Sequence, residues 1–173
     1  MPQPDAALIE RIRAASRKMV RELGFMQPTV AGTQYPPSAV HALLEIEAAR
    51  SLSAVQLAGI LGLEKSSVSR MIRKLIDAGE LQETATAQDG RVKLLTLTAR
   101  GKRTAAAINA FGRRQVAGAL EQLGAAGQEA VGRGLAIYAD ALEAKRAGAS
   151  ADELRAEPGI AGASRPRRGA PNP

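Results

Sequence analysis

The segment EKSSVSRMIRKL, residues 64–75, places short hydroxyls and long cations on one side of a predicted helix. At about 100° per residue its apolar side chains form one stripe, made of Val68, Met71, Ile72, Leu75 and Ile76. The opposite side and its flanks carry Ser66, Ser67, Ser69, Arg70, Arg73, Lys74 and Asp77. Hydroxyls allow a close approach to a surface and cations reach the charge beside it, which a helix in a DNA major groove needs. The alternative is an ordinary solvated face, although such faces usually pair Glu with Lys at four-residue spacing.

The charge of the chain favours a polyanionic partner. The net charge is +7, and residues 50–103 hold ten Lys or Arg against five acids. Aromatic residues make up only 2% of the chain, which argues against a platform that stacks single-stranded RNA bases. The absence of cysteine excludes disulfides and thiolate chemistry, and a single histidine cannot build a metal site alone. We therefore expect double-stranded DNA as the partner, no cofactor and no metal.

The elements expected around this segment suggest how it is positioned. Helices are expected over residues 6–23, 38–49, 53–61, 64–78, 99–123 and 126–146. Ser38 is expected to cap the second helix, a Ser53–Gln56 capping box the third, and Thr98 the fifth. Glycine at position 62 would form the turn between two short helices. Alternating runs at residues 80–86 and 91–98, separated by AQDG, predict a β-hairpin. The expected fold is mainly α with a small β-hairpin wing.

These elements group into one domain and a tail. We expect a DNA-binding and dimerisation domain over residues 1–148, with a winged helix-turn-helix at about 38–98 flanked by dimerisation helices 6–23 and 99–146. Those flanking helices carry more apolar surface than one small winged helix can cover. Residues 149–173 are rich in Gly, Ala, Pro and Ser and are expected to form a disordered tail. With no signal peptide and no membrane-spanning run, the expected location is cytoplasmic.

Two stretches resemble the MarR family of bacterial transcriptional regulators. They are LAGILGLEKSSVSRMIRKLIDAGEL at residues 57–81 and DGRVKLLTLTARG at residues 89–101. The second is similar to the family's wing signature, with its positions at Asp89, Arg91, Leu97, Thr98 and Gly101. Many relatives have two consecutive arginines after the wing acid, whereas this chain has Gly90 before Arg91, and Lys93 would compensate in part. The resemblance covers about residues 6–146.

The resemblance implies a homodimer that presents two recognition helices to a palindromic operator. Ser66, Ser67, Ser69 and Arg70 would face base edges, while Arg73 and Lys74 would contact phosphates. Arg91 would enter the minor groove, oriented by Asp89. A solvated hairpin tip is the alternative for Arg91, and a good turn the alternative for Asp89. The implied function is a sequence-specific, effector-responsive regulator, with repression favoured over activation.

The connection at residues 24–37 is the candidate effector region. It holds Phe25, Met26 and Tyr35, and His41 follows on the next helix. The resemblance implies a small aromatic or anionic effector in the crevice between the dimer layer and the winged helix, which would involve Phe25, Tyr35 and His41. The alternative is that Phe25 and Met26 only hold the connection on the core, with His41 an exposed helix residue.

Residues 21–46 also resemble the regulator half of proteins in which this domain is fused to a GNAT acetyltransferase. Residues after 146 contain no Gly-rich pyrophosphate loop and no predicted strands. We therefore do not transfer the acetyltransferase activity of those fusion proteins to this chain, which is not expected to be an enzyme. Two alternatives to a DNA-binding regulator that acts alone therefore stay open. The chain is the regulator half of such a fusion, or it is a winged helix that binds an acidic protein partner.

Overall fold

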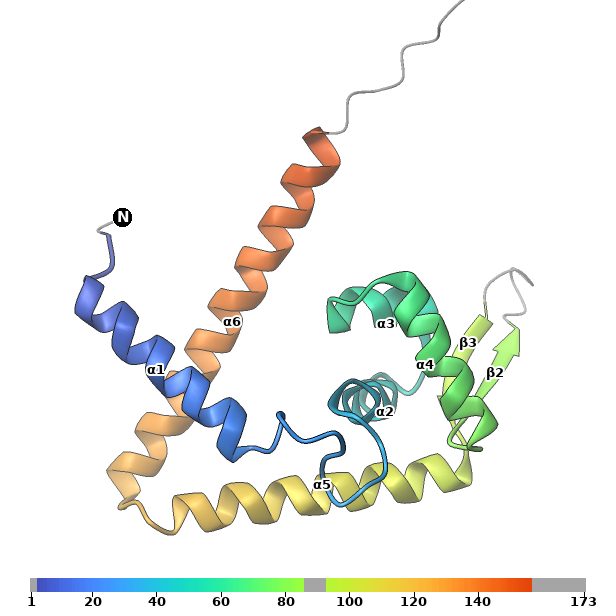
Figure 1. The fold of residues 1–173 in the computed structure, drawn as a ribbon, viewed down its shortest axis with the longest axis horizontal. Coiled ribbons are helices and arrows are strands. Elements are labelled where there is room, and N and C mark those ends of the chain that lie inside the picture. The colour runs from blue at the N-terminus through green and yellow to red at the C-terminus, as the bar shows by residue number, and fades with distance from the viewer. Residues whose placement is uncertain (1–2, 86–92, 157–173) are drawn as a thin grey trace, which may run out of the picture. The chain divides into compact units, whose positions relative to one another are not determined.

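The structure, a computed structural model, describes residues 3–85 and 93–156 of the chain. Within these ranges the elements are α1 (Ala6–Glu22), α2 (Pro37–Ala49), β1 (Leu52–Ser53), α3 (Ala54–Leu61), α4 (Lys65–Asp77), β2 (Leu81–Ala85), β3 (Lys93–Leu97), α5 (Ala99–Leu120) and α6 (Ala125–Ala156). The chain divides into two compact units, Met1–Ala119 and Leu120–Pro173. The first contains a winged helix-turn-helix, and the second contains α6 (Figure 1).

The winged helix is built around one apolar core to which α2, α3, α4, the start of α5 and the sheet all contribute. Its largest fully buried apolar side chains are Leu43, Ile46, Leu57, Val68, Leu75, Leu81 and Leu95. Aliphatic side chains fill this core almost alone, as the low aromatic content requires. The core fixes α4 against the sheet, which is the placement that a recognition helix needs.

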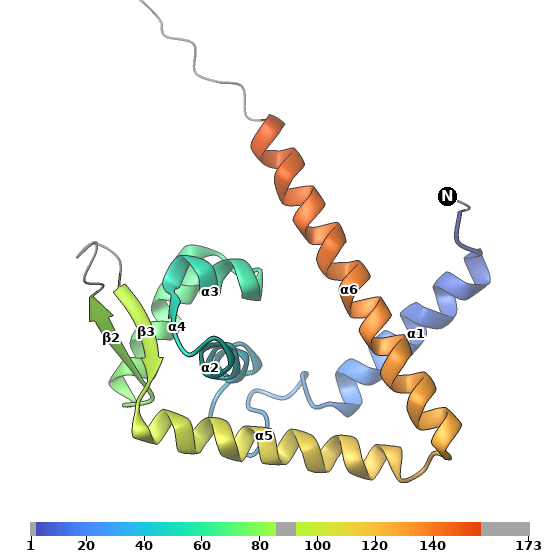
Figure 2. The ribbon, with the colours of Figure 1, turned by 180° about the vertical axis from the view of Figure 1, so that it is seen from behind.

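The wing is a small antiparallel sheet with strand order β1-β3-β2. Leu81 lies opposite Leu97 at its base, and Ala85 lies opposite Lys93 toward its tip. Viewed from behind, β2 and β3 run side by side next to α4 (Figure 2). The predicted hairpin is confirmed, but β1 was not predicted, because two residues are too few to show alternation. Its Leu52 pairs with Leu95 and adds the third strand.

The helix-turn-helix starts and turns as its sequence predicts. The Ser53 hydroxyl accepts the Gln56 N–H at 3.2 Å, and the Gln56 side chain accepts the Ser53 N–H at 2.8 Å, so the capping box is confirmed. Gly62 has φ +63° between α3 and α4, the left-handed conformation that glycine adopts without strain. Gly79, with φ +71°, ends α4 in the same way.

Three predicted helix ends are wrong. Ser38 is not a cap, because the helix already begins at Pro37 and Pro36 is its N-cap residue. The helix predicted over 99–123 ends at Leu120. The helix predicted to end at 146 continues to Ala156, through residues expected to belong to the tail, because SADELRA contains mostly good helix formers. The rest of the predicted tail, 157–173, lies outside the described residues.

Helices α1 and α6 expose much of their apolar surface in the protomer. α1 has no buried residue, and Leu8, Ile9, Met19 and Val20 are between 40 and 42% exposed. On α6 the exposed apolar side chains include Val131, Leu135, Tyr138 and Leu142. None of the described helices combines the length and apolarity that a lipid bilayer requires of a spanning segment.

Candidate nucleic-acid interface

Helix α4 separates its residues into two faces. Val68, Ile72 and Leu75 are buried, and Met71 and Ile76 pack against the same core, so the predicted apolar stripe is confirmed. The other side chains of this helix reach the surface: Ser66, Ser69, Arg70, Arg73, Lys74 and Asp77 are exposed and Ser67 is half-buried. Packing therefore fixes the helix by one face and leaves the hydroxyls and cations of the other face accessible.

Two hydrogen bonds order the exposed face near its N-terminal end. The Ser69 hydroxyl donates to the backbone carbonyl of Lys65 at 2.9 Å, which leaves its oxygen lone pairs outward. The Arg70 guanidinium donates from Nη2 to the Ser67 hydroxyl at 3.1 Å. This bond holds the guanidinium along the helix while its other N–H groups remain available. Arg70 is thus partly ordered before any ligand binds.

The exposed face of α4 carries three cations whose side chains have no ion-pair partner among the described residues. Within the described residues, Arg70, Arg73 and Lys74 form no ion pair with any carboxylate. Glu64 and Asp77, at the two ends of the helix, are the acids nearest in sequence. Free cations on a rigid helix are the arrangement that binds phosphates, because no existing partner has to be displaced.

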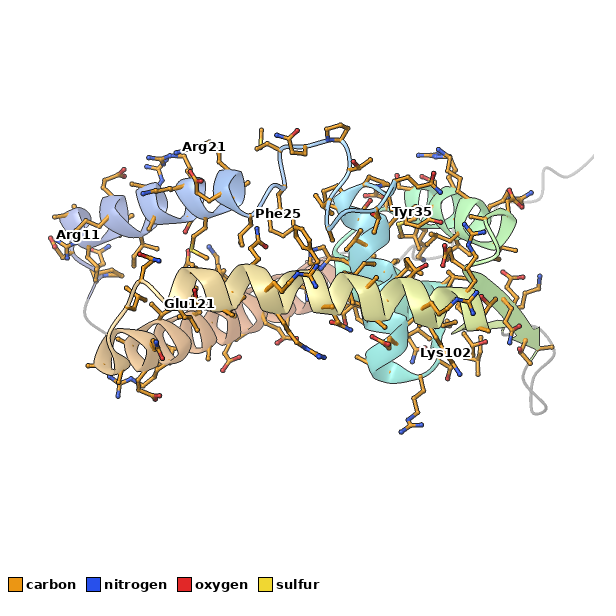
Figure 3. The ribbon with its side chains drawn as sticks, turned by 90° about the horizontal axis from the view of Figure 1, so that it is seen from below. Arg11, Arg21, Phe25, Tyr35, Lys102 and Glu121 are labelled. Atoms are coloured by element: carbon orange, nitrogen blue, oxygen red, sulfur yellow. The ribbon has the colours of Figure 1, made fainter. Side chains whose placement is uncertain are left out.

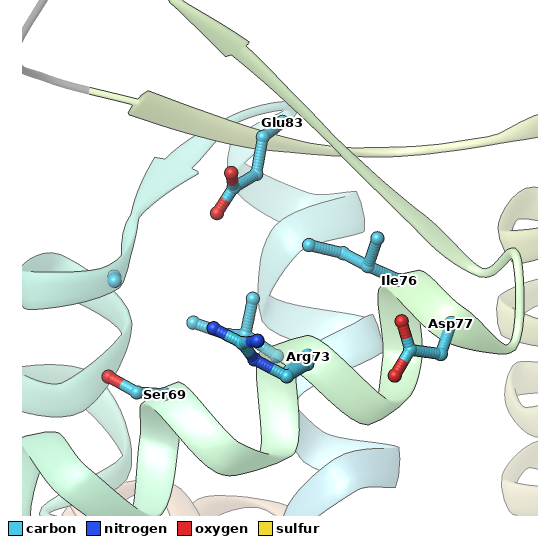
Figure 4. A pocket seen from close by; sticks show the side chains of 7 residues that line it. Ser69, Arg73, Ile76, Asp77 and Glu83 are labelled. Atoms are coloured by element: carbon cyan, nitrogen blue, oxygen red, sulfur yellow. The ribbon is translucent and has the colours of Figure 1, made fainter.

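A hollow of about 410 Å³ lies between this face and the wing, lined by Ala54, Ser69, Ile72, Arg73, Ile76, Asp77 and Glu83. In the close view, Glu83 projects from β2 toward α4 and Arg73 lies across from it (Figure 4). Lys93 Nζ lies 2.7 Å from Glu83 Oε2, so a predicted DNA-contacting lysine is paired with an acid on the neighbouring strand. Both side chains are partly exposed, and such pairs are weak enough to exchange partners.

Sequence reasoning did not single out Glu83. The register of the hairpin could have revealed it. Because Ala85 pairs with Lys93, Glu83 lies diagonally across from that lysine on the neighbouring strand. The two wing-tip residues predicted to contact DNA, Asp89 and Arg91, lie outside the described residues.

The three candidate effector residues do not form one cluster. Phe25 stacks on His41 with ring centroids 5.6 Å apart and planes inclined by 16°. Tyr35, at the other end of the connection (Figure 3), donates its hydroxyl to Glu80 Oε1 at 2.8 Å. Tyr35 also borders a second hollow, of about 270 Å³, lined by Tyr35, Pro36, Ser38, Ala39, Ser67, Arg70, Met71, Lys74 and Leu75. One candidate effector residue therefore shares a cavity with α4, and the other two pair with each other.

Glu80 is a charged residue that is buried within the winged helix and only 1% exposed. Arg100 Nε donates to the same carboxylate at 3.1 Å. Burial would raise the pKa of Glu80, but the nearby Thr104 side chain and the hydrogen bonds from Tyr35 and Arg100 outweigh burial and lower that pKa. Burial, followed by the bond to Glu80, raises the pKa of Tyr35. At neutral pH the pair therefore consists of a carboxylate and a neutral phenol, which is the form that makes the observed hydrogen bond.

Comparisons with known proteins agree with this geometry. The model of the MarR family matches residues 33–92, from the turn before α2 to the wing. No curated protein matches the chain. Among solved structures, FabT of Streptococcus pneumoniae in complex with DNA has a TM-score of 0.68 at 19% identity, over 78% of this chain and 97% of FabT.

Two further structures show the same likeness. A mutant of MarR from E. coli has a TM-score of 0.61 at 18% identity, over 80% of this chain and 98% of that protein. Bordetella bronchiseptica BpsR, whose DNA binding is regulated by 6-hydroxynicotinic acid, has a TM-score of 0.60 at 18% identity, over 75% of this chain and 98% of BpsR. At these identities the likeness establishes a shared fold.

Proposed function

Because the chain belongs to the MarR family of DNA-binding transcriptional regulators, we propose that it binds a palindromic operator as a homodimer and acts as an effector-responsive repressor. The observation that carries the proposal is the face of α4 on which Arg70, Arg73 and Lys74 lie exposed and, within the described residues, without a carboxylate partner. The family consists of regulators rather than enzymes, so the residues are assigned to binding and none to catalysis.

In this proposal α4 lies in the major groove. Ser66, Ser67, Ser69 and Arg70 face base edges, because the N-terminal part of a recognition helix enters the groove first. The bond between Arg70 and Ser67 supports this role, since a pre-ordered guanidinium loses less entropy when it pairs with a base. Arg73 and Lys74, further along the helix, contact the phosphates that flank the groove.

The wing supplies the second contact. Arg91 enters the adjacent minor groove and Asp89 orients it through a charge-assisted hydrogen bond. Lys93 leaves Glu83 for a phosphate, an exchange that costs little free energy because the existing pair is partly exposed. Glu83 then faces the phosphates with no cation, which limits how tightly the wing binds.

A second copy of the chain is proposed to cover the exposed apolar side chains of α1 and α6. The supporting observation is that Leu8, Ile9, Leu135 and Leu142 are each more than 40% exposed in the protomer. A two-fold dimer places two copies of α4 about one helical turn of DNA apart, which calls for a palindromic target.

A small aromatic or anionic effector is proposed to release the DNA. The cavity beside Tyr35 supports this, because an anion there would neutralise Arg70 and Lys74, which also line it. BpsR, with the same fold, responds to an aromatic acid. Phe25 and His41 are not among the residues that line this cavity. We assign them an indirect part in the response to the effector, because their stacked rings anchor the connection at residues 24–37.

The experiment measures fluorescence anisotropy of DNA flanking the chain's own gene and of a scrambled control, across a salt series. The wild type is expected to prefer the native DNA and to weaken steeply with salt. Arg91→Ala should lose about 1–3 kcal/mol of binding free energy on the native DNA. No measurable binding to either DNA at low salt would contradict the proposal and favour the acidic protein partner instead.

A further inference from the structure

Glu80 lies where the recognition helix ends and the wing begins. Its backbone N–H donates to the carbonyl of Leu75 at 2.9 Å, which closes the last turn of α4 after Gly79. The next residue, Leu81, starts β2 and is buried in the core. The backbone of Glu80 therefore connects α4 directly to β2.

The side chain of Glu80 bridges two further segments. Its Oε1 accepts the Tyr35 hydroxyl at 2.8 Å and Arg100 Nε at 3.1 Å. Tyr35 lies 45 residues earlier, in the connection before α2, and Arg100 lies in the first turn of α5. One buried oxygen thus joins the connection, the wing and α5.

The backbone at Glu80 provides a second connection between the base of the wing and α5. Its carbonyl accepts the N–H of Thr98 at 3.0 Å, and the Thr98 hydroxyl donates to the carbonyl of Gly79 at 2.6 Å. The backbone of Gly101 packs directly against the same carbonyl of Glu80. The junction of wing and α5 is therefore held by the backbone, whereas the Tyr35 side chain provides the hydrogen-bonded link from this junction to the connection.

Tyr35 belongs to a turn that is ordered by its own hydrogen bonds. The N–H of Val30 donates to the carbonyl of Tyr35 at 3.2 Å, and the N–H of Tyr35 donates to the Thr33 hydroxyl at 3.0 Å. That hydroxyl donates to the carbonyl of Val30 at 2.8 Å. Residues 30–35 therefore form one small unit, which packs on the core through Val30, Ala31 and Tyr35. The bond between Tyr35 and Glu80 joins this unit to the base of the wing.

We propose that Glu80 is a positioning residue, whose buried carboxylate holds the turn at residues 30–35 against the base of the wing and so refines the placement that core packing gives the wing beside α4. The consequence for DNA rests on the proposed function, since simultaneous binding of α4 and the wing requires that placement. If the turn at residues 30–35 moves, the hydrogen bond from the Tyr35 hydroxyl to Glu80 transmits the movement to the base of the wing.

Spin-label distances test the placement without DNA. The chain has no cysteine, so Thr29→Cys beside the turn and Thr84→Cys on β2 give a unique label pair, both at exposed positions. Labelled protein is diluted with unlabelled protein, so that distances within one copy dominate. In this background Tyr35→Phe, which removes only the hydroxyl, should broaden or shift the distance distribution.

A second variant and a matched control accompany this measurement. Arg100→Ala removes the other donor from a mostly exposed side chain, so it leaves no buried cavity, and it should broaden the distribution as well. Arg103→Ala removes the same charge from the same helix without contacting Glu80 and should leave the distribution unchanged. Distributions of Tyr35→Phe and Arg100→Ala that match that of Arg103→Ala would overturn the proposal.

DNA binding then separates positioning from general damage. Tyr35→Phe should bind native DNA roughly three- to tenfold more weakly than wild type. Its affinity for scrambled DNA and its salt dependence should stay at the wild-type values, because nonspecific binding does not require the wing to be placed. An equal loss on both DNAs would contradict a positioning role. If the wild type binds neither DNA at low salt, the proposed function fails, while the spin-label distances still decide the role of Glu80.

Discussion

Gly101→Ala is expected to lower the free energy of unfolding by about 3 kcal/mol or more. A β-carbon at this position would overlap the backbone oxygen of Glu80 and would lie 3.3 Å from Leu97 Cδ2. The oxygen cannot move away freely, because it accepts the N–H of Thr98. The added methyl group must therefore separate α5 from the base of the wing. Chemical denaturation monitored by circular dichroism measures the loss.

Gly112→Ala is the matched control for this substitution. It lies in the same helix, and a β-carbon there would meet nothing within 4 Å. Since alanine is the better helix former, this variant should be more stable than wild type by about 0.5–1 kcal/mol. Equal destabilisation by the two substitutions would show that the contact with Glu80 does not explain the effect of the first.

Leu75→Ala and Arg73→Ala should separate the two faces of α4. Leu75 is 1% exposed in the core, and its truncation should cost about 2–5 kcal/mol of unfolding free energy. Arg73 lies two positions away on the exposed face and forms no ion pair within the described residues. Arg73→Ala should change stability by less than about 0.5 kcal/mol.

In DNA-binding measurements on folded protein, Arg73→Ala should cause the larger loss of affinity and Leu75→Ala the smaller. Arg73→Ala should weaken binding to native and scrambled DNA alike and reduce the slope of log affinity against log salt by about 1, as expected for a lost phosphate contact. Leu75→Ala, measured at a temperature where it is folded, should keep the wild-type slope. A stability loss for Arg73→Ala as large as that for Leu75→Ala would contradict the division of the helix into a packed and a binding face.

Local patterns in the sequence were sufficient to predict most of the winged helix. The capping box at Ser53 and Gln56, the glycine turn at Gly62 and the apolar stripe of α4 each arise from residues within one or two turns of each other. The structure confirms all three. The start of the long helix at Thr98 was predicted as well, and the Thr98 hydroxyl accepts the N–H of Gly101 at 3.0 Å.

Contacts between distant residues could not be predicted in the same way. Glu80 reads as a solvated acid after a helix-ending glycine, and its burial depends on Tyr35 and Arg100, which are 45 and 20 residues away. Tyr35 was predicted as an effector residue, whereas its hydroxyl in the structure is bonded to Glu80. The two-residue β1 exists only because Leu52 pairs with Leu95. Each of these features requires tertiary packing that no short window of sequence contains.

The central claim, that the exposed face of α4 lies in a DNA major groove, is tested most directly by cleavage from a tethered iron chelate. Because the chain has no cysteine, Ser66→Cys provides a unique attachment point on the exposed face. Cuts are expected in the major groove of the preferred DNA, in two clusters about one helical turn apart. A chelate at Glu129→Cys, on α6, is the control. Cleavage from position 66 that is no stronger than from position 129, while the protein remains bound, would contradict the claim.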